Sequence, residues 1–547
     1  MTAADTATSA PSALHSFARR LDVIATVLVC IPIAWHALRA ALTDWVPIGD
    51  DAYFTLRSMD VATSHHPWLG AWSSGSVGVD RSVNNLGPMQ LDLLAPFTRF
   101  FPSGGTAIAV AVVNIAAIVT AAWLLGRIGG RRATLIAMLP IALLTWTMGS
   151  EMLITPRQHQ FLLLTYLCFL VAAWAAAVGD RWAMVPAVVT ASLLTQTHLS
   201  YPILVASVGL VAVVGQVAAW WRSAERSSWV RPWTIAGLLA LGLWAQTVYD
   251  QFFVWGNFTD VLASPGTGEQ PGLRTATSIV GGTLLDPGSY VRRGYATFDP
   301  ETLDGAIAAV GAIVLALVLA AGAVVAFLRR RPVASAGLAV AAAAVAAAIV
   351  DASQLPITVF GLTPFNYRWL WPTGTFLLIG AAIAVSRLDR VDRLLDDRRA
   401  SFGVVGVVGL LAVMNLPVSL QVPDPARYEN DQRGVAALMA QLEEVALDGP
   451  VVIDQTNMYF GHSYGYPTAV VLRDRGLDYR FVSELQERRF GADRVADGTE
   501  PTTLVLWAGD DAVARRDDPS TVVYVDVDPP IAVELITDTV AGTEGSP

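Results

Sequence analysis

The stretch "WVPIGDDAYFTLRSMDV", which begins at Trp45, places two neighbouring carboxylates, Asp50 and Asp51, directly after a long apolar segment. Ionisable groups near a membrane are costly to bury and are often functional. A carboxylate held there can act as a general base toward a hydroxyl group. The structural alternative is a helix N-terminus, where acidic side chains satisfy free amides and interact favourably with the helix dipole.

The two aspartates open a long connection, residues 45–104, between two apolar segments. Connections of this length without a function are uncommon in compact proteins. The connection ends in "SVNNLGPMQLDLLAPF", in which Asn84 and Asn85 precede a Gly-Pro pair. The pair favours a turn, and the two amides are also candidates for a polar wall that faces the carboxylates.

Further polar side chains lie where other apolar segments end on the same predicted side. Alone, each has an ordinary explanation, such as an interfacial aromatic or a buried histidine. Together they predict a polar cavity that opens outward, in which guanidinium groups would bind a lipid phosphate in bidentate fashion. The candidates for substrate or lipid-phosphate binding are Asn84, Asn85, His65, His66, Arg157, His159, His198, Tyr201, Tyr367 and Arg368, and Arg292 and Arg293 are further phosphate candidates.

A metal site stays undecided. Asp50 and Asp51 with His65 or His66 offer ligands for a divalent cation such as Mg²⁺, Mn²⁺ or Ca²⁺. Neighbouring residues on a helix point about 100° apart, so both carboxylates rarely bind one ion. No ligand spacing is typical of zinc.

The composition predicts a polytopic membrane protein. The chain has 547 residues, of which 54% are hydrophobic and 15% charged, with a mean hydropathy of +0.48. Soluble domains carry about 25% charged residues. Eleven apolar runs approach the length that spans a bilayer: 22–44, 105–126, 133–149, 160–178, 183–200, 202–221, 233–250, 305–328, 333–350, 368–386 and 402–420.

The distribution of arginine predicts the orientation in the plasma membrane. With the N-terminus in the cytoplasm, the short connections "GRIGGRR", "WRSAERSSWVR", "RRRP" and "SRLDRVDRLLDDRRA" lie on the cytoplasmic side. The long connections 45–104 and 251–304 then lie outside, as the positive-inside rule requires. Residues 1–420 form the membrane domain, and the C-terminal part is extracytoplasmic.

Residues 421–547 are predicted to form a separate domain. From Asp424 to Pro547 the chain has 23 acidic and 10 basic residues, a net charge of −13. The whole chain has a net charge of −10, so the remainder is slightly basic. "DQRGVAALMAQLEEVAL" has helical spacing, and "GPVVIDQ", "TTLVLWAG" and "STVVYVDV" are typical of strands. The pattern indicates a small α/β domain with a disordered tail.

These features resemble the GT-C superfamily of membrane glycosyltransferases, which includes protein mannosyltransferases, aminoarabinose transferases and actinobacterial arabinofuranosyltransferases. The resemblance lies in the acidic pair of "GDDAYF", the long first outer loop, the re-entry "NNLGPMQL", and the C-terminal outer domain. The chain differs in having Asp51 where several members have glutamate, and it lacks the His-Pro-Pro stretch of the family. An arginine-only basic composition fits an actinobacterial genome.

The resemblance implies a polyprenyl-phosphate sugar donor and an acceptor hydroxyl on a glycan or protein, and no nucleic-acid partner is expected. It implies that Asp50 is the general base of an inverting transfer, and that Asp51 orients it or contacts the acceptor, although the two roles can be exchanged. Two other functions fit parts of the sequence. One is a transporter or flippase of lipid-linked sugars, and the other is a non-catalytic scaffold that binds glycan through "QTNMYFGHSYGYPTAV".

Overall fold

The computed structural model describes most of the chain. The described residues are 20–43, 45–73, 76, 82–101, 104–264, 268–291, 299–303, 305–357, 361–396, 398–458 and 464–537. Arg292, Arg293 and the tail from residue 538 onward lie outside the described residues, as does part of the segment suggested for glycan binding.

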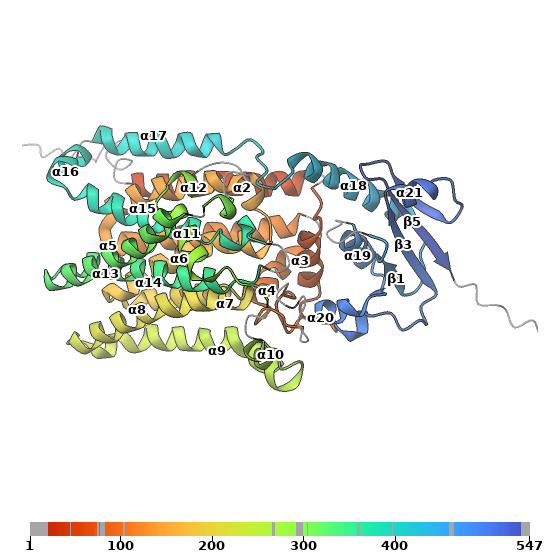
Figure 1. Ribbon diagram of the computed structural model, residues 1–547, viewed down its shortest axis with the longest axis horizontal. Helices are drawn as coiled ribbons and strands as arrows, with labels where there is room; N and C mark the ends of the chain where they lie inside the picture. Colours follow the sequence, from red (N-terminus) through yellow and green to blue (C-terminus); the bar gives the residue numbers. More distant parts are fainter. Residues whose placement is uncertain are drawn as a thin grey trace, which may run out of the picture.

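A bundle of long apolar helices forms the larger part of the molecule (Figure 1). Its principal helices are α2 (Leu21–Leu42), α5 (Gly105–Met152), α6 (Gln158–Val178), α7 (Met184–Thr197), α8 (Tyr201–Arg222), α9 (Val230–Phe253), α13 (Ala306–Leu328), α14 (Pro332–Gln354), α15 (Leu370–Ser386) and α17 (Arg398–Met414). In the part of the chain that the structure describes, seven helices are long and apolar enough to cross a bilayer. The chain is therefore a multi-pass membrane protein by helix length and composition.

The 48-residue helix α5 contains two of the predicted spans. Its helical conformation is interrupted at Gly130, where φ is 75° and ψ is 176°. Thr134 Oγ1 donates to Ala122 O at 3.3 Å, and Asn114 Nδ2 donates to Leu153 O at 3.0 Å. These bonds join the two arms, which therefore run antiparallel as a helical hairpin. Helices thus occupy all eleven predicted ranges, while the number that cross the membrane stays a prediction.

The region 251–304, predicted above as a long outer loop, is largely helical where it is described. It contains α10 (Asn257–Ala263), α11 (Gly272–Leu284) and α12 (Gly288–Val291). Helix α11 is packed against α13 and α14, and a Cβ on its Gly281 would lie only 1.8 Å from Ala308 O. Thirteen residues reach about 20 Å, too short for a full span, so hydropathy over a long window did not indicate this buried helix.

The first outer loop and the C-terminal domain lie at the same end of the bundle, opposite α16 (Asp389–Asp396) (Figure 1). The loop contains α3 (Asp50–Met59) and α4 (Met89–Thr98). An antiparallel bridge between Trp72 and Asn84 draws its two described halves together. Which side of the membrane this end faces stays a prediction.

The C-terminal domain is a five-stranded mixed sheet with helices packed against it (Figure 1). The strand order is β2-β1-β3-β5-β4, in which β1 is parallel to β2 and β3, while β5 is antiparallel to β3 and β4. Its elements are α18 (Pro425–Glu444), β1 (Val451–Asp454), α19 (Gly465–Asp474), β2 (Tyr479–Phe481), α20 (Glu487–Phe490), β3 (Thr502–Ala508), α21 (Asp510–Ala514), β4 (Thr521–Val525) and β5 (Ile531–Thr537).

Hydrogen bonds fasten this domain onto the first outer loop. Gln432 Nε2 on α18 donates to Val46 O at 2.9 Å. Arg488 Nη2 donates to Ser82 O at 2.8 Å, and Asn84 Nδ2 donates back to Arg488 O at 3.0 Å. The loop that carries the two aspartates is therefore held between the helix bundle and the domain.

Candidate active site

The two aspartates occupy the first turn of α3, but neither caps it. Gly49 is the N-cap residue with a φ of 51°, and no side chain satisfies the free amides. The two side chains differ sharply in exposure, because successive residues point to different sides of a helix. Asp50 is exposed, whereas Asp51 is fully buried. Side-chain capping therefore does not account for the pair, while both carboxylates lie in the first turn, where they interact favourably with the helix dipole.

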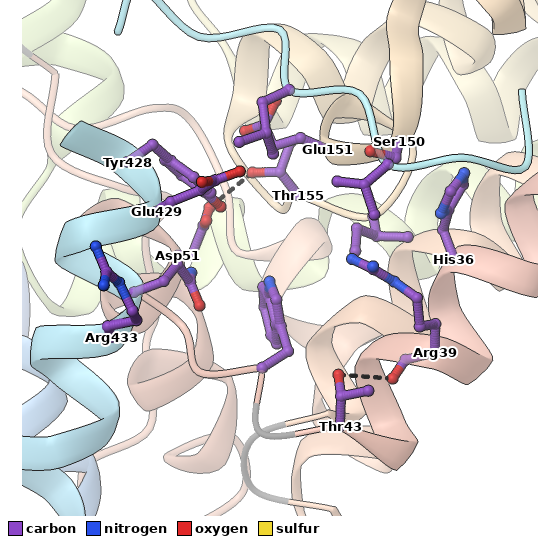
Figure 2. Close-up of a pocket in the computed structure, with 15 residues that line it drawn as sticks. His36, Arg39, Thr43, Asp51, Ser150, Glu151, Thr155, Tyr428, Glu429 and Arg433 are labelled. Carbon is purple, nitrogen blue, oxygen red and sulfur yellow. Dashed lines mark hydrogen bonds between the residues drawn. The ribbon is translucent and has the colours of Figure 1, made fainter. Parts of the chain in front are cut away.

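Asp51 is bound by two residues from the segment between α5 and α6. Thr155 Oγ1 donates to Asp51 Oδ1 at 2.7 Å, and Figure 2 shows the two side chains pointing toward one another. Arg157 Nη2 lies 3.3 Å from Asp51 Oδ2. Burial raises the pKa of Asp51, and the Arg157 charge and the Thr155 hydroxyl oppose that rise. A carboxylate with a raised pKa is better matched to proton abstraction near neutral pH.

The segment that supplies these partners begins where helix α5 loses regular geometry. Gly149 has a φ of 68°, a conformation that other residues adopt only with strain. A Cβ there would approach Ser419 O to 2.7 Å. Ser150 N donates to the same Ser419 oxygen at 3.0 Å, so this end of α5 is held against the chain that follows α17. The turn places Glu151 beside Asp51.

Glu151 adds a second buried carboxylate to the group. Arg157 Nη1 lies 3.7 Å from Glu151 Oε1, so one guanidinium faces both acids. In the described part of the chain, neither Glu151 oxygen has a hydrogen-bond partner. The Arg157 guanidinium also lies 6.0 Å from the ring centroid of Tyr428 on α18. The C-terminal domain therefore contributes a wall to this site.

A cavity of about 520 Å³ opens at Asp51 (Figure 2). Its walls come from α2, the end of α5, the segment after α17, and α18. The lining residues are His36, Arg39, Thr43, Trp45, Asp51, Ser150, Glu151, Ile154, Thr155, Val418, Leu420, Tyr428, Glu429, Gln432 and Arg433. We call this space the Asp51 cavity. It has the size of a small-molecule site, and most of its lining residues are polar or charged, among them the carboxylates Asp51, Glu151 and Glu429.

Two cations of the Asp51 cavity were not found by sequence reasoning. Arg39 lies in the last turn of α2, and Arg433 lies on α18. Among the described residues, neither forms an ion pair with a carboxylate. The one signal for Arg39 is a cation at the predicted outer end of the first span, where the positive-inside rule disfavours it. Arg433 had no such signal, because it is one charge among many in an acidic domain.

Several predicted binding residues lie next to the Asp51 group but do not line the cavity. The rings of His159 and His198 are 4.4 Å apart between centroids, and His198 lies 6.4 Å from Tyr201. Arg368 Nη1 lies 3.0 Å from the side-chain oxygen of Gln160 when that amide is turned to satisfy both its donor and its acceptor. Tyr367 and Arg368 are buried.

The remaining predicted residues lie elsewhere. Asn85 Oδ1 accepts from Leu199 N at 3.0 Å, and Asn85 Nδ2 donates to Ala71 O at 2.9 Å. Asn84 bonds to Gly70 O and to Arg488 O. Both amides therefore tie segments together. The predicted polar wall facing the carboxylates is not formed by their side chains.

His65 and His66 contact residues outside the group formed by Asp51, Glu151, Thr155 and Arg157. His65 Nδ1 contacts the Asp493 carboxylate, and His66 Nε2 lies 2.9 Å from Gln246 Oε1. Both histidines thus have partners other than Asp50 and Asp51. Among the described residues, no group of three or more histidine, cysteine, aspartate or glutamate side chains is placed to hold a metal ion.

Comparison with known proteins finds similar solved structures but no matching sequence family. No family model matches the chain, and no curated protein matches it. The structure of ArnT from Cupriavidus metallidurans bound to undecaprenyl phosphate is similar over 95% of this chain and 99% of that chain, with 15% identity and a TM-score of 0.46. The oligosaccharyltransferase of Archaeoglobus fulgidus in complex with Zn and sulfate is similar over 89% of this chain and 67% of that chain, with 13% identity and a TM-score of 0.42. At these identities and TM-scores, a function has to be inferred from the site itself.

Proposed function

We propose that the protein is a membrane glycosyltransferase of the GT-C type. It transfers a sugar from a polyprenyl-phosphate donor to a glycan or protein acceptor on the outer face of the plasma membrane. The observation that carries the proposal is the buried Asp51, bound by Thr155 and Arg157 in a cavity that Arg39 and Arg433 also line. Among the described residues, neither of these arginines forms an ion pair with a carboxylate. A base and cationic groups that can face a phosphate in one cavity are what this transfer requires.

The reaction places each group in a distinct role. The acceptor hydroxyl attacks the anomeric carbon and forms the new C–O bond while its proton passes to the Asp51 carboxylate. The bond between the anomeric carbon and the phosphate oxygen breaks, and the polyprenyl phosphate leaves with the electron pair. Arg39 and Arg433 stabilise the charge that develops on that phosphate. Attack from the side opposite the leaving group inverts the anomeric centre.

Two features favour Asp51 over Asp50 as the base. Asp51 lines the cavity, whereas Asp50 is exposed and does not. Burial also raises the pKa of Asp51 toward the range in which a base is most effective. The Arg157 charge offsets part of the repulsion between Asp51 and Glu151. In this assignment Asp50 contacts the acceptor, so the roles implied by the family resemblance are exchanged.

The test uses a deletion strain complemented with wild-type protein, Asp51→Asn or Asp50→Asn at matched protein levels. Asp511→Asn is the matched control, because Asp511 is exposed on α21 in the C-terminal domain. Polyprenyl-phosphate sugars and envelope glycans are quantified by mass spectrometry. We expect Asp51→Asn to accumulate one lipid-linked sugar and to lose one glycan linkage. Wild-type glycans in both Asp50 and Asp51 variants would overturn the proposal.

The orientation belongs to the same proposal. Fusions of a periplasm-dependent reporter enzyme after residue 331 and after residue 458 should be inactive and active, respectively. The opposite pattern would place the Asp51 cavity on the cytoplasmic side and would exclude an outer-face reaction.

A further inference from the structure

The end of the bundle away from the C-terminal domain carries a basic, tryptophan-rich surface at the connection between α8 and α9 (Figure 1). Residues 181–233 contain four arginines, one glutamate and five tryptophans. Six of these side chains form what we call the Arg-Trp surface: Trp182, Trp220, Arg226, Trp229, Arg231 and Trp233. None of the roles proposed above uses it.

Each arginine of the Arg-Trp surface lies over an indole ring. The Arg226 guanidinium is 5.2 Å from the ring centroid of Trp220, and the Arg231 guanidinium is 5.9 Å from that of Trp182. Stacking engages the flat face of a guanidinium and leaves the N–H groups at its edge available to an anion. Arg226 also donates to Trp221 O at 3.2 Å, which uses only part of its donor capacity. Both arginines are exposed, so their remaining donors can reach a ligand.

The two arginines differ from a third arginine at the same end of the bundle. Arg127 lies 5.1 Å from the ring centroid of Trp123, but its Nε and Nη2 atoms both bind the Asp180 carboxylate. Within the described ranges, Arg226 and Arg231 form no such ion pair. Their charges are therefore available to attract an anionic group, whereas the charge of Arg127 is neutralised.

The indole rings form a rigid support for these charges. The ring centroid of Trp233 lies 5.9 Å from those of both Trp220 and Trp229. Trp233 Nε1 donates to Gln216 Oε1 at 3.2 Å, and the buried Gln216 donates in turn to Ala176 O at 2.9 Å. These contacts hold the rings against the end of α6. Indole side chains are enriched where a membrane protein meets lipid headgroups.

The length of α8 places the Arg-Trp surface at the level of the headgroups. Leu199, just before α8, donates to Asn85 of the first outer loop, so α8 begins at the end that carries the Asp51 cavity. The helix has 22 residues and is apolar enough to cross a bilayer. It is about 33 Å long, which matches a hydrocarbon core of about 30 Å. The connection that follows it therefore reaches the opposite leaflet.

Apolar side chains extend from the Arg-Trp surface toward the middle of the bilayer. Helices α8 and α9 each pack against α7, and much less against one another. Both expose apolar side chains, which include Leu210 and Val214 on α8 and Leu238 and Leu241 on α9. Leu238 lies seven residues after Arg231, or about 10 Å along the helix. A ligand with a charged head and apolar chains matches this arrangement.

We propose that the Arg-Trp surface binds an anionic phospholipid of the leaflet opposite the Asp51 cavity. Arg226 and Arg231 bind its phosphate, and its acyl chains lie along the exposed faces of α8 and α9. A zwitterionic lipid carries an ammonium group that offsets its phosphate, so a headgroup with net negative charge is preferred. Helix α9 buries few of its side chains, and the lipid stabilises its position beside α8. The inference is independent of the proposed transferase function.

The first experiment measures lipid preference. Purified full-length protein in detergent is titrated with phosphatidylglycerol or with phosphatidylcholine of identical acyl chains, and bound lipid is quantified by native mass spectrometry. We expect the wild type to prefer phosphatidylglycerol, and the double variant Arg226→Gln with Arg231→Gln to bind it at least about 10-fold more weakly. Arg329→Gln with Arg331→Gln is the matched control, because both arginines are exposed on the α13–α14 connection, which has no tryptophan. An equal loss in the two double variants, or no preference in the wild type, would overturn the proposal.

The second experiment locates the lipid. A photoreactive phenylalanine derivative replaces Val230, which is 63% exposed beside Arg231, or in a separate protein Trp123, which is 45% exposed beside the neutralised Arg127. Each protein is irradiated in vesicles with equal amounts of phosphatidylglycerol and phosphatidylcholine, and lipid adducts are identified by mass spectrometry. We expect phosphatidylglycerol to be enriched at position 230 and not at position 123. Equal amounts of the two lipids at position 230, or the same enrichment at both positions, would contradict the proposal.

A third measurement separates lipid binding from folding. A ligand that binds only the folded state raises the unfolding temperature. We expect phosphatidylglycerol to raise the Tm of the wild type above its value in phosphatidylcholine, and the double variant Arg226→Gln with Arg231→Gln to lose this difference. The two proteins should have the same Tm in phosphatidylcholine. Equal stabilisation of both proteins by phosphatidylglycerol would show that the lipid acts elsewhere.

Discussion

Thr155 Oγ1 donates a 2.7 Å hydrogen bond to Asp51 Oδ1 across 104 positions of sequence. The bond joins the first outer loop to the turn between α5 and α6. It favours the ionised form of the carboxylate, while burial favours the neutral form and raises the pKa overall. The balance between these two effects determines the pH at which Asp51 can accept a proton.

Replacement of this hydroxyl should move the pH dependence of activity. In Thr155→Val the stabilising bond to the carboxylate is lost, so the pKa of Asp51 rises further. Hydrogen bonds to charged groups contribute about 1.5–3 kcal/mol, and about 1.4 kcal/mol corresponds to one pKa unit. We expect the acidic limb of the pH–rate profile to move upward by about one pH unit or more. Thr145→Val, which removes a hydroxyl that donates to Ala142 O within the same helix, is the control and should leave the profile unchanged.

Removal of the central cation should destabilise the protein through its two acids. Arg157→Gln leaves Asp51 and Glu151 buried without the guanidinium that faces both. Breaking a buried ion pair costs about 3–5 kcal/mol, and we expect a lower thermal unfolding temperature in detergent. The double variant Arg157→Gln with Glu151→Gln should recover part of the loss. Equal stability of the single and double variants would show that the acids do not interact through Arg157.

The unpaired cations of the Asp51 cavity should control donor affinity. Arg39→Gln and Arg433→Gln each remove a guanidinium proposed to bind the phosphate, and we expect each to weaken binding of a polyprenyl phosphate about 10-fold or more. Binding is measured on purified full-length protein. Arg222→Gln makes the same change at an exposed position at the end of α8 and should bind as the wild type does. A uniform effect of all three variants would indicate a general charge effect instead.

The positive φ of Gly149 should make that position sensitive to any side chain. In Gly149→Ala the new Cβ is both strained and within 2.7 Å of Ser419 O. Strain of this kind costs on the order of 1–3 kcal/mol, and it displaces the turn that carries Glu151 and Thr155. We expect lower stability and lower activity together. Gly403→Ala on α17, where a Cβ meets open space, should lower neither.

The sequence predicted the features that depend on local chemistry. Apolar runs placed helices at every range named for a span. The acidic pair was recognised because its position next to an apolar segment is unusual. In each case the signal lies within one continuous stretch of chain.

The features that sequence reasoning missed depend on contacts between distant segments. Thr155 is an ordinary threonine until the fold brings it to Asp51, and Arg433 lines the Asp51 cavity only because α18 packs there. The difference between Asp50 and Asp51 follows from the rotation of one helix. Helix α11 was overlooked because its small residues and short length resemble a loop in a hydropathy profile.

The packing of the C-terminal domain on the first outer loop limits how the domain's sequence can vary among relatives and whether it can be exchanged between them. Arg488 donates to Ser82 O and to the Asp260 carboxylate, and its own carbonyl accepts from Asn84. One residue of the domain therefore contacts both the first outer loop and α10. A domain transplanted from a relative would bring a new surface against an unchanged loop and lose these contacts. The first outer loop, the α9–α10 corner and the domain should therefore vary as one unit among relatives, and a chimera that exchanges all three together should retain its fold.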